Sequence, residues 1–384
     1  MVVFNCTLAI AFISIIFYKY IAIVDFFDFF SLYKENTFEL ASINLTEAED
    51  NYNNVAQRLV KASHDVGFVY LTDVKGYNSE ELLKWTKWLF NLDIDKKMKI
   101  AKKSFNEKNA NVYRGYFPVV EGGHSYKEAF EMGGFNSIYT TEYPTPSSIR
   151  NITTFDGRPI MRNILEERNT WPVSGNDTED RQFRLVMEKY QRFFYETSSV
   201  IFRLMIHGLG FEKESYDYLF GPKSLSTYRL IHYPSRLANS PETIPDEAWD
   251  GDIAIATGEH FDSTIITLLS TFHFTGLQIK PVGYSKWINV PADKHRLVVN
   301  VGALLEHLAD RKMVATNHRV LDGGNSRYSV AMFYEPSHDA DISKTFSGKN
   351  NDYVGNFIKY GLWMSNRTKM FAEYRTTDFG VDVD

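Results

Sequence analysis

Apolar residues recur every three to four positions in three segments of the first 210 residues, a spacing typical of amphipathic helices. The predicted helices span residues 46–62, 78–92 and 179–208, and the last is the longest. Short apolar runs at residues 21–25 and 67–71 predict strands. This part of the chain therefore has a mainly helical pattern with isolated strands.

The pattern changes after about residue 224, where short β-rich runs alternate with turn residues. The predicted strands span residues 225–233, 264–269, 276–280, 287–290, 297–301, 313–320 and 328–334. Many short strands with little helix between them favour a β-sandwich or barrel. We therefore expect a mainly β fold with flanking helices. We expect residues 21–223 to form a section of helices and strands that wraps the core, residues 224–340 to form the core itself, and residues 341–384 to form a helical extension.

Two further segments are polar and predict no regular core element. Residues 137–180 are polar and contain four prolines, which predicts a long irregular excursion that is either a lid or a plain surface insertion. Residues 96–103 are rich in lysine, and we expect a solvated, charged surface there.

The first 20 residues form an apolar segment that is marginal in length for a membrane span. It lacks a basic start and a clear cleavage site, so it is either a signal sequence or anchor, or an extension outside the folded core. We expect a cytoplasmic protein, with a membrane-anchored or secretory location as the alternative. Any membrane association would depend on residues 1–20.

The composition excludes several classes of function. Apolar residues make up 44% of the 384 residues and charged residues 23%, which is ordinary for a globular protein. The net charge is −6 and no basic stripe stands out, so nucleic-acid binding is disfavoured. Cys6 is the only cysteine, which excludes disulfide frameworks, thiolate zinc fingers and iron–sulfur clusters. Any metal must therefore be bound by His, Asp, Glu or water.

Two histidines and one aspartate form a candidate metal site. His260 and Asp262 are two residues apart, and we expect them at the start of a strand with both side chains on one face. His318 lies in a later β-rich run and would supply a third ligand. Two imidazoles and one carboxylate on one side of a metal are the facial triad of non-haem Fe(II) oxygenases. The H-x-D pattern alone is weak evidence, because it often occurs by chance.

A second pair of residues strengthens this interpretation. Arg327 and Ser329 share one face of a predicted strand shortly after His318. A guanidinium fork with a hydroxyl group binds a carboxylate through charge-assisted hydrogen bonds, and lysine lacks that planar fork.

These motifs, together and in this order, resemble the isopenicillin N synthase-like family of Fe(II)/2-oxoglutarate-dependent dioxygenases. The resemblance runs from the strand at residues 21–25 to about Pro336. It includes the stretches Val66–Leu71, Arg114–Tyr116, Lys127-Glu128, Asn169–Pro172, Arg229–Pro234, Gly258–Asp262, Gly276–Gln278, Asn300–Gly302, His318–Val320 and Arg327–Ser329.

The resemblance implies a double-stranded β-helix, or jelly-roll, core. It also implies that His260, Asp262 and His318 ligate iron, while Arg327 and Ser329, assisted by Tyr233, bind the distal carboxylate of 2-oxoglutarate. The implied reaction uses O2 and 2-oxoglutarate, releases succinate and CO2, and hydroxylates, desaturates or cyclises a small-molecule substrate. Ascorbate is a candidate supporting reductant.

Two alternatives remain open at this point. An oxidase like isopenicillin N synthase would use O2 without 2-oxoglutarate, and a non-catalytic jelly-roll would only bind a ligand. The chain also departs from the family pattern at Ile231, where many members have Asn, and at Phe261, where a small polar residue is frequent. Arg114 and Tyr116 lie where the family has a substrate-side loop, so they are candidate substrate contacts. The sequence says nothing about oligomeric state.

Overall fold

The computed structural model describes residues 39–120, 125–133, 161–220, 224–371, 374 and 377–381. The apolar segment 1–20, the strand expected at residues 21–25 and most of the excursion at 137–180 lie outside these ranges. Within the described ranges, no helix combines the length and the apolar character needed to cross a membrane.

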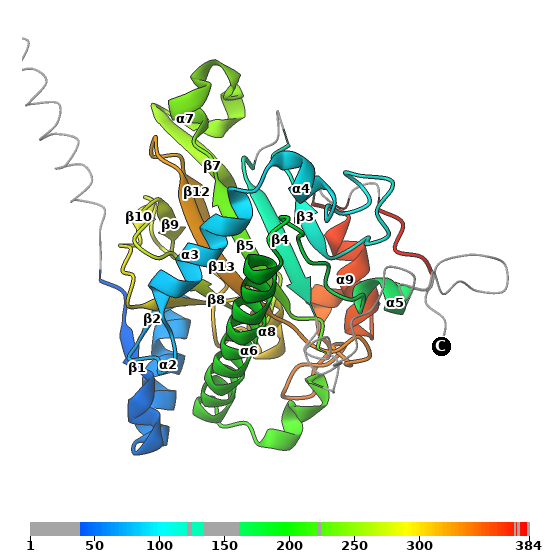
Figure 1. Ribbon diagram of the computed structural model, residues 1–384. Coiled ribbons are helices and arrows are strands. Elements are labelled where there is room, and N and C mark those ends of the chain that lie inside the picture. The colour runs from blue at the N-terminus through cyan, green and yellow to red at the C-terminus, as the bar shows by residue number, and fades with distance from the viewer. Residues whose placement is uncertain are drawn as a thin grey trace, which may run out of the picture.

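Two β-sheets form the centre of the molecule (Figure 1). The eight-stranded sheet contains, in spatial order, β1 (Ser42–Asn44), β2 (Phe68–Thr72), β11 (Leu297–Val301), β8 (Ile266–Ser270), β13 (Arg327–Tyr334), β5 (Thr227–Tyr233), β4 (Glu128–Gly133) and β3 (Gly115–Phe117). The five-stranded sheet contains β10 (Ile288–Asn289), β9 (Leu277–Lys280), β12 (Asn317–Leu321), β7 (Ile253–His260) and β6 (Trp249–Asp250). Strand pairs between neighbours are antiparallel, apart from β1 with β2. The expectation of a mainly β fold is confirmed.

Strands from before residue 224 belong to the same sheet as strands from after it. β4 pairs with β5, and β2 pairs with β11, so the first part of the chain extends the core sheet as well as covering it. The division of the chain at residue 224 stays a prediction.

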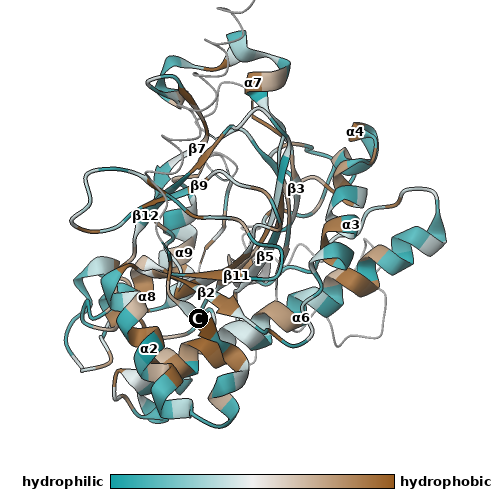
Figure 2. Ribbon diagram, turned by 90° about the vertical axis from the view of Figure 1, so that its left-hand side faces the viewer, coloured by the Kyte–Doolittle hydropathy of each residue, from teal (hydrophilic) through white to brown (hydrophobic). Residues whose placement is uncertain are grey.

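Four helices contact strands of the eight-stranded sheet: α2 (Tyr52–Asp65), α3 (Ser79–Phe90), α4 (Ile94–Met98) and α6 (Asp177–Gly208). The other helices of the described residues are α5 (Met161–Leu165), α7 (Arg236–Asn239), α8 (Ala303–Leu308) and α9 (Tyr360–Thr368). Short 3-10 turns span Leu45–Glu49, Lys213–Ser215, Asp217–Leu219, Pro241–Thr243, Asp246–Ala248 and Asp352–Val354. α3 and α6 both contact β13, and α2 packs against α6 and β2. Figure 2 shows hydrophobic and hydrophilic segments alternating along α6.

Side-chain caps set where the two long predicted helices begin. The Asn78 side chain accepts hydrogen bonds from the first amides of α3, and Asn176 does the same for α6. The predicted helix at residues 46–62 begins differently, because Asn44 caps a 3-10 turn and α2 starts only at Tyr52. All three predicted helices are therefore confirmed, but the helix predicted to begin at residue 46 begins at Tyr52.

The predicted strands after residue 224 are confirmed with shifted ends, except that β12 begins four residues later than expected. Residues 313–316 leave the sheet because Val314 donates its amide to the carbonyl of Ser63 in α2. Most of β7 was not expected from the sequence.

The basic segment at residues 96–103 is only partly a solvated surface: Lys99 and Lys103 are exposed as expected, but the expectation is wrong for Lys97 and Lys102. Lys97 is 7% exposed and its Nζ lies 2.8 Å from Glu128 Oε2; Lys102 is fully buried and its Nζ lies 2.6 Å from Glu131 Oε2. Both acids are on β4. Burial of these lysines is tolerated because each pairs with a carboxylate, which offsets the cost of desolvation.

The contact of α6 with the sheet predicts a contrast between two leucines of one helix. Leu204 is fully buried and Leu185 is 53% exposed. Leu204→Ala should lower the free energy of unfolding by about 2–5 kcal/mol, because it leaves a cavity. Leu185→Ala should change it by less than about 0.5 kcal/mol. Urea denaturation of both variants measures the difference, and equal effects would contradict this packing.

Candidate iron centre

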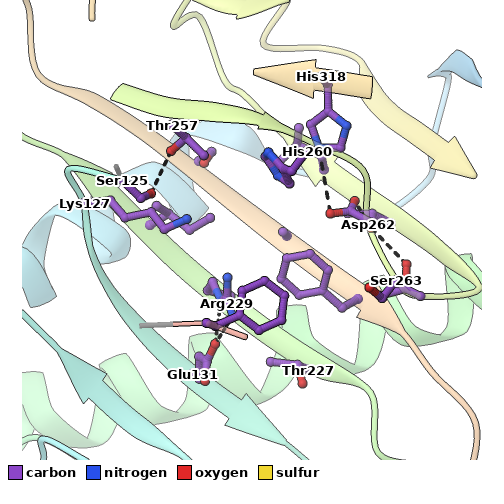
Figure 3. Close-up of a pocket in the computed structure, with 18 of the residues that line it drawn as sticks. Ser125, Lys127, Glu131, Thr227, Arg229, Thr257, His260, Asp262, Ser263 and His318 are labelled. Carbon is purple, nitrogen blue, oxygen red and sulfur yellow. Dashed lines mark hydrogen bonds and ion pairs between the residues drawn. The ribbon is translucent and has the colours of Figure 1, made fainter. Parts of the chain in front are cut away.

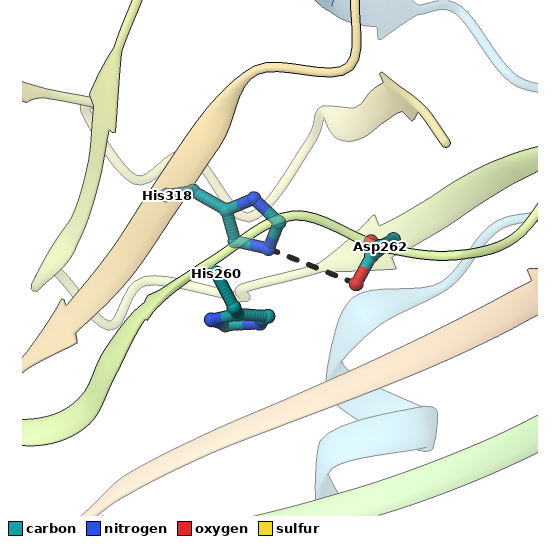
Figure 4. Close-up of side chains that lie close together, drawn as sticks. All are labelled: His260, Asp262 and His318. Carbon is teal, nitrogen blue, oxygen red and sulfur yellow. Dashed lines mark ion pairs between the residues drawn. The ribbon is translucent and has the colours of Figure 1, made fainter. Parts of the chain in front are cut away.

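β7 and β12 bring the two candidate histidines side by side. His260 and His318 are directly paired in the antiparallel register, and their ring centroids are 4.3 Å apart. The ladder is irregular immediately after this pair. Figure 4 shows both rings and the Asp262 carboxylate converging on one point. One ligand atom from each of the three residues lies within 4.8 Å of the others.

Asp262 reaches this point from beyond a strand, which corrects the expectation drawn from its spacing. His260 is the last residue of β7, not near the start of a strand, and Asp262 lies in the connection to β8. The alternation of side chains along a strand therefore does not determine the position of Asp262. The connection is held because the amide of Ala303 donates to the Asp262 carbonyl at 2.8 Å.

Backbone carbonyls orient both imidazoles. His260 Nδ1 lies 2.8 Å from the carbonyl of Gly258, and His318 Nδ1 lies 3.1 Å from that of Thr316. A carbonyl only accepts, so each Nδ1 donates a proton and Nε2 is the ring nitrogen that remains available to a metal. The Nε2 of His318 lies 3.8 Å from Asp262 Oδ1. Neutral imidazoles with an exposed Nε2 are suitable metal ligands.

Two further side chains hold the carboxylate of Asp262. Thr267 Oγ1 donates to Asp262 Oδ2 at 2.6 Å, and Asn300 Nδ2 donates to the same oxygen at 2.8 Å. These bonds leave Oδ1 facing His318. Sequence reasoning assigned no role to Thr267 or Asn300; the available signal was the Asn300–Gly302 stretch within the family resemblance.

The charges of the three residues match those required of metal ligands. Burial, together with the nearby His318, lowers the pKa of His260 to about 4, so its ring is neutral at neutral pH. Burial tends to raise the pKa of Asp262, but His318, His260 and the bonds from Thr267 and Asn300 outweigh it and lower that pKa. Two imidazole nitrogens and one carboxylate fit the donor set of non-haem Fe(II).

Arg327 lies at one end of the same cavity, beside Tyr233. The two residues are paired across β13 and β5, and the guanidinium carbon is 5.0 Å from the tyrosine ring centre. Arg327 donates to the Thr275 carbonyl at 3.1 Å and its Nη1 lies 3.5 Å from Ser329 Oγ. It is only 6% exposed, and burial lowers its pKa. No carboxylate of the described residues lies within ion-pair distance of it.

A cavity of about 600 Å³ between the two sheets joins these groups (Figure 3). All six residues predicted for the site line it: Tyr233, His260, Asp262, His318, Arg327 and Ser329. Aromatic and aliphatic side chains form much of its wall, and residues from α9 onward close one side: Met364, Arg367, Thr368, Met370, Phe371 and Tyr374.

Two expected substrate contacts do not line this cavity. Arg114 is 1% exposed and donates to Thr227 Oγ1 at 2.6 Å, while Tyr116 donates to Glu128 Oε2 at 2.5 Å. Both side chains are committed to contacts beneath the cavity wall, so the expectation that they touch substrate is wrong.

Comparisons with known proteins agree with this geometry. The model of the 2OG-Fe(II) oxygenase superfamily matches residues 227–336, and that of the non-haem dioxygenase in morphine synthesis N-terminal region matches residues 38–149. Isopenicillin N synthase of Streptomyces clavuligerus is 25% identical over 316 residues, which is 81% of this chain and 88% of the relative. The 2-oxoglutarate-dependent dioxygenase tropC of Talaromyces stipitatus is 25% identical over 84% of this chain and 92% of the relative.

The chain belongs to the isopenicillin N synthase-like family of Fe(II)/2-oxoglutarate-dependent dioxygenases. Its fold is similar to that of Neurospora crassa T7H in complex with alpha-KG, with a TM-score of 0.66, 19% identity and coverage of 86% of this chain and 95% of that one. It is also similar to JOX2 in complex with 2OG, Fe and JA, with a TM-score of 0.59, 17% identity and coverage of 90% and 87%. The expected jelly-roll core, enzyme class and cofactors are thereby confirmed for this dioxygenase.

The bonds to Asp262 predict that Asn300 supports metal affinity without touching the metal. Asn300→Ala should weaken Fe(II) binding by about 10–100-fold, because residues that orient a ligand typically contribute that much. Asn325→Ala, at an exposed position, is the matched control. Anaerobic Fe(II) titration measures both. Unchanged affinity in Asn300→Ala would show that this hydrogen bond does not orient the ligand.

Proposed function

We propose that His260, Asp262 and His318 bind the Fe(II) of this dioxygenase. The observation that carries the proposal is the convergence of their ligand atoms within 4.8 Å inside a cavity that also contains the buried Arg327, which has no carboxylate partner among the described residues. All three ligands approach from the five-stranded sheet and its outgoing connection, so the opposite side of the centre faces the cavity. A co-substrate, O2 and the substrate need that open side.

The second part of the proposal is that Arg327, Ser329 and Tyr233 bind the distal carboxylate of 2-oxoglutarate. The buried guanidinium pays a desolvation cost that an incoming carboxylate would offset. The Ser329 hydroxyl lies on the same strand face, and the Tyr233 ring supports the guanidinium plane. The bond from Arg327 to the Thr275 carbonyl holds the fork in place before the acid arrives.

The chain's residues prepare the reaction by fixing geometry and charge. Bound Fe(II) would supply the activation of O2 that converts 2-oxoglutarate into succinate and CO2 and oxidises the substrate. Thr267 and Asn300 hold Asp262 in its ionised form, so one negative charge faces the metal position. The apolar side chains of the wall exclude water, and the substrate is a small organic molecule that fits the remaining volume.

A second candidate is an oxidase that uses O2 without 2-oxoglutarate. The coverage of 81–82% by the isopenicillin N synthase relatives favours it. Arg327 and Ser329 would then hold a carboxylate of the substrate. Membership in an enzyme family, with all three candidate ligands present, argues against a non-catalytic binding protein. The cytoplasmic location stays a prediction.

Titration with 2-oxoglutarate separates the two enzymes. We expect heat of binding when 2-oxoglutarate is added to protein loaded with Mn(II), and succinate release when Fe(II), ascorbate and O2 are supplied. Absence of both signals would reject the dependence on 2-oxoglutarate.

Asp262→Ala should abolish metal loading in the same assay, because the only carboxylate of the triad is removed. Normal loading of Asp262→Ala would contradict the ligand assignment.

Replacing Arg327 tests the carboxylate site. Arg327→Gln should raise the Kd for 2-oxoglutarate about 10–150-fold, since a charge-assisted hydrogen bond contributes about 1.5–3 kcal/mol. Metal loading should be retained. Arg58→Gln, which removes an exposed guanidinium on α2, is the control and should leave the Kd unchanged. An unchanged Kd in Arg327→Gln would place the acid elsewhere.

A further inference from the structure

A second arginine faces the cavity at a distance from Arg327. Arg229 and Tyr233 lie on the same face of β5, four residues apart, and Arg229 pairs with Ala331 of β13 while Tyr233 pairs with Arg327. Four residues of strand correspond to about 13 Å. The backbones that carry the two arginines are therefore well separated along the sheet. Figure 3 shows Arg229 across the cavity from the histidines.

Arg229 is held in place by a buried carboxylate on the neighbouring strand. Glu131 pairs with Arg229 across β4 and β5, and Arg229 Nε donates to Glu131 Oε1 at 2.6 Å. The other carboxylate oxygen accepts from Lys102 Nζ at 2.6 Å and from the Tyr374 hydroxyl at 2.5 Å. Burial tends to raise the pKa of Glu131, but Arg229, Lys102 and the hydrogen bonds outweigh it and keep the group ionised.

Of these three charged side chains, the arginine has the most exposed surface, although Glu131 also borders the cavity. Glu131 and Lys102 have no exposed side-chain surface, whereas 17% of the Arg229 side chain is exposed. The arginine therefore presents a guanidinium that Glu131 already holds in position to whatever occupies this end of the cavity.

The rest of the described lining favours the same sign of charge. It contains the cations Lys127, Arg229, Arg327 and Arg367, and the acids Glu131, Asp262 and Glu335. Asp262 belongs to the metal centre. Burial raises the pKa of Glu335 to about 7, so near neutral pH this group is only partly ionised. A negatively charged substrate would meet little repulsion here.

Aromatic rings flank the guanidinium. Its carbon lies 4.8 Å from the ring centre of Phe333 and 5.7 Å from that of Phe117. Tyr113 and Phe371 line the same cavity. A ligand whose charged group reaches Arg229 would therefore place an apolar body between these rings and the metal centre.

Taking the metal and 2-oxoglutarate sites of the proposed function as given, we propose that the substrate is an apolar carboxylic acid whose carboxylate binds Arg229. Its apolar body lies against the aromatic wall, with a C–H bond directed to the metal position. Arg229 is the specificity-determining residue, and Glu131, supported by Lys102, is the positioning residue that aims it.

The test compares carboxylic acids with their uncharged amides. Protein loaded with Mn(II) and 2-oxoglutarate is titrated calorimetrically with phenylacetate, hydrocinnamate and cyclohexylacetate, and with the primary amide of each. We expect at least one acid to bind about tenfold or more tightly than its amide, as a charge-assisted bond requires. The proposal is overturned if no acid of the panel binds better than its amide.

Variants assign any preference to Arg229. Arg229→Gln should remove the preference for acid over amide, and Arg229→Lys should retain part of it because the charge remains. The exposed control Arg58→Gln should keep the full preference. Arg229→Gln leaves Glu131 paired with Lys102, so a folded protein is expected, and its thermal unfolding transition checks this. A preference that persists in Arg229→Gln would also overturn the proposal.

The substrate assignment and the co-substrate assignment can be tested separately. If wild-type protein binds 2-oxoglutarate but shows no acid preference, the substrate assignment is wrong and the proposed function stands. If it shows an acid preference that depends on Arg229 but no 2-oxoglutarate binding, the co-substrate assignment is wrong and the acid site stands.

Discussion

The cross-strand pairing of His260 with His318 is the contact on which the site depends. It places two imidazoles 4.3 Å apart by backbone register alone, and the connection after β7 then carries Asp262 to the same point. A shift of one residue in that register would turn the His318 side chain to the other face of the sheet. The remaining features of the centre refine this placement: carbonyls orient the rings, and Thr267 with Asn300 orients the carboxylate.

The cavity uses charge in three separate ways. At the metal position, the ionised carboxylate of Asp262 lies beside two imidazoles. At the Arg327 end, a buried cation without a carboxylate partner among the described residues is prepared for an incoming acid. Beyond it on the same sheet, Arg229 is already held by Glu131, whose carboxylate also accepts a hydrogen bond from Lys102. Burial strengthens the interaction of each charged group with its partner, and it makes an unpartnered charge costly.

The eight-stranded sheet connects these groups to the rest of the fold. β5 and β13 run side by side through the centre of this sheet and carry Tyr233, Arg229, Arg327 and Ser329 toward the cavity. Their outer faces are packed by α3 and α6. The segment from α9 onward completes the wall on the open side. A rigid layer of strands and helices therefore supports the side chains that need fixed positions, and a less regular segment borders the space left for substrate.

The amino-acid sequence by itself determined the chemical types in the site, because H-x-D, the later histidine and the Arg-x-Ser pair are short patterns with few alternative uses in combination. It also determined the long helices, whose periodicity and asparagine caps are local. Only the tertiary structure decided that Asp262 lies past the end of a strand, that Thr267 and Asn300 hold it, and that Lys102 is buried against Glu131. These outcomes depend on pairings between residues far apart in the chain, such as β4 with β5, and no local pattern encodes which partner a charged side chain meets.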